Sequence, residues 1–237
     1  MSSPDPSPSL PGTREFRSVR PDRAFAWYAE ALRLFKRRPV GFALLAIGVA
    51  VVEIAVSLIP VAGLPAANVL VPIFASSLLF AGLATDRGDG PRAVHFIAPL
   101  AAPVQAIAAV VLATLAVSVT EWLAGWQFTG VNILSLDERT TMSVRDAMVV
   151  YAVGIAASLP LTLVPLFAYF EGASLRDAFG WSVGAFVRNV PPFLLYAGLS
   201  MALLGIVFVT QGLAVPIVLP LWALSSYAAW KDVTSAG

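Results

Sequence analysis

The sequence predicts an all-α, polytopic transmembrane bundle of six spans, and three observations lead to this prediction. The 237-residue chain is 58% hydrophobic and only 12% charged, whereas soluble domains average about 45–50% apolar and about 25% charged residues. Its mean hydropathy is +0.82. Most charges lie between six long apolar stretches, which themselves contain only Glu53 and Glu121. We exclude a soluble bundle, because none of these stretches has a polar face to meet water.

Residues 1–23 precede the first apolar stretch and are rich in proline and serine. Such a segment cannot bury enough apolar surface to offset the entropy lost on ordering, so we expect a disordered cytoplasmic tail. It also lacks the apolar core of a secretory signal, and we therefore expect the first span to be retained as an anchor. Residues 24–237 are predicted to form a single transmembrane domain.

A transmembrane helix needs about 20 mostly apolar residues, and six stretches meet this requirement. They cover residues 40–60, 64–84, 101–124, 147–170, 191–209 and 212–230. The connections at 61–63 and 210–211 are so short that the first two spans and the last two are predicted to form antiparallel hairpins. The longest outer connection ends in Ser143-Val-Arg-Asp146, a capping-box pattern that predicts a helix start near Val144.

The distribution of basic residues predicts the orientation. When six spans alternate, thirteen of the fifteen Lys and Arg residues fall on the side that holds both termini, and only Arg139 and Arg145 fall on the other. Basic residues accumulate in cytoplasmic loops. Both termini are therefore predicted to be cytoplasmic, in a multi-pass protein of the cytoplasmic (inner) membrane.

Short amphipathic segments precede the odd-numbered spans at 24–38 and 174–189, with a weaker counterpart at 91–99. In the first segment, basic residues share one helical face and aromatic residues cover the other, so we expect it to lie in the lipid headgroup layer. The second capping-box pattern, Ser174-Leu-Arg-Asp177, predicts the start of the last of these interfacial helices.

Similar motifs recur along the chain and predict an internal repeat. Phe35-Lys-Arg37 matches Phe186-Val-Arg188 at the same distance before a span. The even-numbered spans share a Pro-x-aromatic-Ala pattern at Pro72, Pro165 and Pro220. The sequence thus predicts three copies of a unit made of an interfacial helix, a plain span and a proline-containing span. All three units begin on the same side, so the repeat is parallel.

Three features together resemble a bacterial family of six-helix integral membrane proteins of unknown function. They are Trp27 with Leu34-Phe35-Lys36-Arg37-Arg38-Pro39, the proline-bearing even spans, and the ending Tyr227-Ala-Ala-Trp230-Lys231-Asp232-Val233. The layout is more distantly similar to the membrane region attached to some glycerophosphodiester phosphodiesterases. This chain has Trp230 and Thr234 where the family pattern has Tyr and Phe. It shows no catalytic domain, so the resemblance implies no phosphodiesterase activity.

Glu53, Asn68 and Gln105 are the candidate polar residues within the membrane. An acidic residue inside a span marks a functional site by default, because its charge is costly there. The simpler interpretation is a protonated Glu53 that shares a hydrogen bond across helices, and the alternative is proton or cation coupling. Asn68 and Gln105 could join a polar pathway or hold helices together.

Five basic residues near the cytoplasmic ends of spans are candidates for binding lipid headgroups. They are Arg33, Lys36, Arg37, Arg38 and Arg188. The chain has no cysteine, one histidine and a formal charge of +1. We therefore expect no metal, no cofactor and no nucleic-acid partner. Without a catalytic motif an enzyme is not expected.

The molecular activity is not readable from these features. We expect a non-catalytic protein that organises membrane lipids or partner proteins, and the alternative is a small-solute or lipid transporter with an acidic site at Glu53. Protein partners are not identified by the sequence, which leaves homo-oligomerisation open.

Overall fold

Helices make up the computed structural model, which describes residues 14–135, 137–138 and 142–235 and contains no strand in these ranges. The α-helices are α1 (Arg23–Arg37), α2 (Pro39–Ser57), α3 (Gly63–Ala75), α4 (Ser77–Asp86), α5 (Val94–Ile97), α6 (Val104–Ala124), α8 (Val144–Ser158), α9 (Val164–Phe170), α10 (Leu175–Arg188), α11 (Val190–Val209) and α12 (Val215–Thr234). Shorter turns are η1 (Ala98–Ala101), the π-helical η2 (Gly125–Thr129) and η3 (Leu159–Leu161). The predicted all-α class is confirmed.

Five helical segments are long and apolar enough to cross a membrane. They are Pro39–Ser57, Gly63–Asp86, Val104–Thr129, Val144–Leu161 and Val190–Val209. These segments correspond to the first five predicted spans and are consistent with a multi-pass membrane protein. The predicted sixth span lies largely in α12, which is not among them, so six spans and the internal repeat stay predictions.

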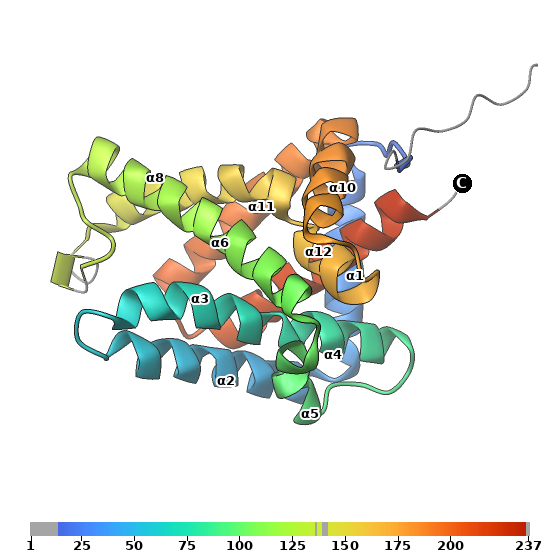
Figure 1. Ribbon diagram of the computed structural model, residues 1–237, viewed down its shortest axis with the longest axis horizontal. Coiled ribbons are helices and arrows are strands. Elements are labelled where there is room, and N and C mark those ends of the chain that lie inside the picture. The colour runs from blue at the N-terminus through green and yellow to red at the C-terminus, as the bar shows by residue number, and fades with distance from the viewer. Residues whose placement is uncertain (1–13, 136, 139–141, 236–237) are drawn as a thin grey trace, which may run out of the picture.

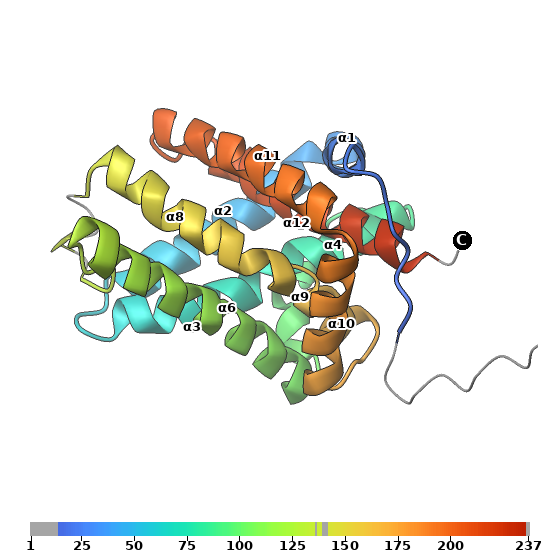
Figure 2. The ribbon, with the colours of Figure 1, turned by 90° about the horizontal axis from the view of Figure 1, so that it is seen from above.

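Helix α12 lies inside the bundle, where it contacts α1, α2, α4 and α11 (Figure 2). Its buried residues include Ser225, Ser226 and Asp232 together with Leu224 and Tyr227. The polar side chains lower the hydropathy of α12. They lie in the protein interior, where hydrogen-bond partners are available.

Proline and serine break the second and fourth predicted spans. Pro72 has no N–H to donate to the carbonyl of Asn68, and the Ser76 hydroxyl donates to the Pro72 carbonyl at 2.8 Å. Such back-bonding bends helices, and the span divides at Ser76 into α3 and α4. The fourth span is likewise divided near Pro160 and Pro165 into α8, η3 and α9.

Both serines of the predicted capping boxes act as helix N-caps. The Ser143 hydroxyl accepts from the backbone N–H of Asp146 at 3.1 Å, and α8 begins at Val144. The Ser174 hydroxyl accepts from the N–H of Asp177 at 3.2 Å, and α10 follows directly. In each box the serine hydroxyl also donates to the aspartate carboxylate, at 2.7 and 2.6 Å.

Helices α1 and α10 cross the end of the bundle at which the C-terminus lies (Figure 1). The predicted apolar face of α1 was expected to meet lipid, but Trp27, Ala31 and Leu34 are fully buried and α1 contacts α12 along its length. Phe25 and Leu32 remain exposed. The buried core of the bundle therefore includes the apolar face of α1, because this face packs against α12.

Residues 14–22, which belong to the predicted tail, lie against the end of the bundle in the structure. The Arg17 N–H donates to the Val233 carbonyl at 3.0 Å. The buried Asn189 accepts from the Val19 N–H at 2.8 Å and donates to the Arg17 carbonyl at 3.0 Å. Phe16 and Val19 are partly buried against the core, so backbone pairing and apolar contacts together hold the segment. The other residues of the predicted tail, 1–13, lie outside the described residues.

Candidate functional site

A cavity of about 490 Å³ lies between α2, α3, α8 and α11. Most of its walls are apolar, and its polar side chains come from two helices. The lining residues are Glu53, Ile54, Ser57, Leu58, Leu64, Met142, Val144, Ala147, Tyr151 and Phe208. The volume lies within the range of about 300–1,000 Å³ that small-molecule pockets occupy.

Glu53 is the acidic residue of this cavity. It lies half-buried on α2, one helical turn before Ser57, so both side chains project from the same face. Tyr151 from α8 and Phe208 from α11 line the cavity as well, with ring centroids 6.1 Å apart. The cavity therefore combines a carboxylate, a hydroxyl and an aromatic pair with apolar walls.

A second, smaller cavity of about 50 Å³ adjoins the first, since Leu64, Met142 and Tyr151 line both. Its polar lining residues are Asn68, Ser118 and Glu121. A polar space of this size is large enough to hold water. The structure thus brings the predicted residue Asn68 close to the cavity of Glu53.

The third predicted polar residue, Gln105, is exposed in the first turn of α6 and lines neither cavity. Glu121 lines the smaller cavity instead. In the sequence it stands out only as a charge within a span. Gly154 on α8 makes room for it, because a Cβ at Gly154 would lie 2.6 Å from Glu121 Cγ and Cδ. The sequence signals that could have identified this contact are an acidic residue in one predicted span and a glycine in the next.

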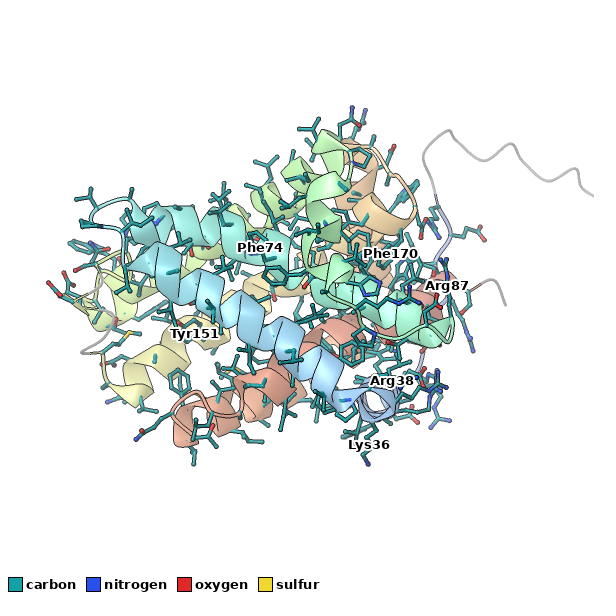
Figure 3. All side chains as sticks on the ribbon, turned by 90° about the horizontal axis from the view of Figure 1, so that it is seen from below. Lys36, Arg38, Phe74, Arg87, Tyr151 and Phe170 are labelled. Atoms are coloured by element: carbon teal, nitrogen blue, oxygen red, sulfur yellow. The ribbon has the colours of Figure 1, made fainter. Side chains whose placement is uncertain are left out.

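The predicted headgroup residues lie at the other end of the molecule, and they do not form one group. Figure 3 shows Lys36, Arg38 and Arg87 at the end opposite Tyr151. Arg37 donates to the Thr85 carbonyl at 3.3 Å. The Arg38 side chain passes over Gly90, where a Cβ would lie 3.2 Å from Arg38 Cγ. The end of α1 and the loop at 87–92 therefore lie side by side.

Arg33 and Arg188 have other surroundings. Arg33 donates to Glu30 at 2.6 Å and lies 3.9 Å from Asp86, and this hydrogen bond lowers the pKa of the Glu30 carboxyl. Arg188 is exposed at the end of α10. Lys36, Arg37 and Arg38, all exposed, are the predicted headgroup residues that gather beside Arg87.

Asp232 joins α1 to α12 near this end. It accepts hydrogen bonds from Arg23 Nε at 2.8 Å and from Trp27 Nε1 at 2.9 Å. Burial acts to raise the pKa of the Asp232 carboxyl, but these two hydrogen bonds together with the charges of Arg23 and Arg17 hold the pKa below its ordinary value. The carboxylate is thus a charged anchor for α1.

No group of three or more His, Cys, Asp or Glu side chains that could hold a metal ion occurs among the described residues. Comparison with protein-family models, with curated proteins and with solved structures finds no match to this chain. The resemblance to a six-helix bacterial membrane family therefore stays a prediction.

Proposed function

We propose that the chain is a multi-pass membrane protein without catalytic activity, which binds anionic lipid at its cytoplasmic rim and so organises the lipid around it. The observation that supports this proposal is the group of exposed cations Lys36, Arg37, Arg38 and Arg87, contributed by the end of α1 and by the residue after α4.

The position of these cations relative to α2 suits a lipid molecule. Helix α2 begins at Pro39, directly after Arg38, and its side chains Val40, Leu44 and Ile47 are exposed. Acyl chains lying along this face would place their phosphate beside the cations. Guanidinium groups bind phosphate oxygens through paired hydrogen bonds, and each basic residue near an anionic surface contributes about 1 kcal/mol.

We also propose that the chain crosses the membrane six times with both ends in the cytoplasm. The hydrogen bond between Arg17 and Val233 supports this topology, because it joins the two ends of the described chain. A parallel repeat is supported by the similar backbone at the tips of two predicted outer hairpins. Val61 at the first tip and Gln211 at the last both have positive φ, 64° and 51°.

The test compares thermal unfolding in nanodiscs of phosphatidylglycerol and of phosphatidylcholine. Wild type is expected to unfold at a higher temperature in the anionic lipid, since a ligand that binds only the folded state stabilises it. Lys36→Gln/Arg38→Gln should lose most of this difference. The control Arg20→Gln/Arg176→Gln, which removes two exposed cations elsewhere, should keep it. Equal losses in both double variants would contradict the proposal.

A second candidate function is transport of a small solute or lipid, and the cavity at Glu53 favours it. An acidic residue in a cavity between four membrane helices is typical of coupling sites. Proteoliposomes loaded with a pH-sensitive dye would be exposed to a panel of solutes. A flux that wild type carries and Glu53→Gln abolishes would support transport, and a flux that survives in Glu53→Gln would count against it.

A further inference from the structure

We propose that the cavity between α2, α3, α8 and α11 binds a single-chain amphiphile with a protonated amine head. The inference is independent of lipid binding at the cytoplasmic rim. It gives a ligand class to the cavity on which the second candidate function rests, and binding there does not require transport.

The mouth of the cavity suits a ligand with an apolar chain. Ile54, Leu58 and Val144 line it, and each of these side chains is more than half exposed, at 62%, 68% and 62%. In a membrane-spanning bundle such side chains face lipid tails. An acyl chain can therefore extend from the cavity into the bilayer without crossing a polar border.

The polar side of the cavity suits a head that donates hydrogen bonds. A carboxylate has two oxygens with about four lone-pair positions, so Glu53 can accept from an ammonium group in addition to any partner within the protein. Ser57, one turn further along α2, offers a hydroxyl acceptor. Tyr151 and Phe208 also line the cavity, and aromatic rings attract cations to their faces.

Charge favours an amine over a carboxylate or a phosphate. Glu53 and Glu121 are the acidic side chains among the described residues that line the two adjoining cavities, and none of those lining residues is Lys, Arg or His. An anionic head would find no cation there and would oppose an ionised carboxylate, whereas a cationic head complements it. The smaller cavity, with Asn68 and Ser118, offers space for water that hydrates the head.

The experiment uses three probes with the same chain: dodecylammonium, dodecanol and dodecanoate. Each is titrated into the full chain in detergent-free phosphatidylcholine nanodiscs, and thermal unfolding and the dissociation constant are measured. Dodecylammonium should raise the unfolding temperature of wild type, dodecanol less, and dodecanoate not at all. Glu53→Gln should weaken dodecylammonium binding about tenfold or more, the ratio expected when one charge-assisted hydrogen bond is lost.

Two further variants keep the result interpretable. Glu15→Gln, in the exposed segment before α1, removes the same charge far from the cavity and should bind as wild type does. Ser57→Phe leaves Glu53 in place but fills the cavity, and it should weaken binding of dodecylammonium and dodecanol alike. If Glu53→Gln does not fold, Ser57→Phe still tests the site.

Several outcomes would overturn the proposal. They are no binding by wild type, dodecanoate binding as tightly as dodecylammonium, and dodecylammonium binding that is unchanged in Ser57→Phe. Amine binding without any flux would uphold this inference and reject transport. A flux of another solute without amine binding would support transport and reject this inference.

Discussion

Val61 has a backbone conformation that a β-branched residue rarely adopts. Its φ is 64°, and its side chain is fully exposed at the tip between α2 and α3. Left-handed backbone costs an L-residue about 1–2 kcal/mol, and glycine avoids this cost but loses more entropy on folding. Val61→Gly should therefore raise the free energy of unfolding by up to about 1 kcal/mol. Denaturant titration measures it, with Ala62→Gly as a control at a φ of −93°. An equal gain in both variants would contradict the strain at Val61.

Asp232 predicts a pH dependence of stability. Its pKa in the folded protein lies below the ordinary 3.8, because hydrogen bonds from Arg23 and Trp27 and the charges of Arg23 and Arg17 together outweigh the burial that would raise it. A carboxyl with a lowered folded pKa stabilises the protein above its unfolded pKa, and this stabilisation is lost as the pH falls through the folded value. Asp232→Asn should therefore be less stable than wild type at pH 7, and the difference should shrink as the pH falls below about 4. Thermal unfolding at a series of pH values measures it, and a constant difference would count against the carboxylate.

At the scale of elements, Asn189 holds the segment at 14–22 against the end of the bundle. Its side chain is 1% exposed and hydrogen-bonds to the backbone of Arg17 and Val19. Replacing it leaves those backbone groups without their partner, which costs about 1–3 kcal/mol for a buried group. Asn189→Ala should thus speed tryptic cleavage after Arg17. Asn132→Ala, in the outer loop, should cleave like wild type. Unchanged cleavage of Asn189→Ala would show that the side chain does not hold the segment.

The packing of α6 against α8 depends on Gly154, because the Glu121 side chain fills the place of its missing Cβ. Gly154→Ala should destabilise the wild-type background. In a Glu121→Ala background the same change should be neutral or stabilising, because alanine favours helix by about 1 kcal/mol over glycine. The coupling is measured by a double-mutant cycle. As a control, Gly205→Ala, whose Cβ would meet open space, should change the stability equally in both backgrounds. An equal effect of Gly154→Ala in both backgrounds would show that its contact with Glu121 is unimportant.

At the scale of the whole molecule, the number of membrane crossings can be measured directly. The chain has no cysteine, so single-cysteine variants report one position each. With six spans, Ser18→Cys and Ser235→Cys should be protected from a membrane-impermeant maleimide added to intact cells, and Gln127→Cys should react. If α12 does not cross, Ser18→Cys and Ser235→Cys should differ. That outcome would reject the six-span topology and, with it, the hydrogen bond between Arg17 and Val233.

The helices were largely predictable because their signals are local. An apolar stretch long enough for a membrane, a serine three residues before an aspartate and a proline within a span each act over a few residues. The sequence predicted a proline-containing span around Ser76 but not its division into two helices. The contacts of residues 14–22 were not predictable, since their partners Asn189 and Val233 lie about 170 residues or more away along the chain.

The sequence alone established the all-α class and the approximate bounds of the apolar helices, because hydrophobicity acts position by position. Only the tertiary structure decided which polar residues share a cavity. It placed Asn68 and Glu121 beside the cavity of Glu53, and it left Gln105 exposed elsewhere. The physical reason is that the rotation and pairing of membrane helices depend on the packing of side chains from distant segments, which no local pattern records.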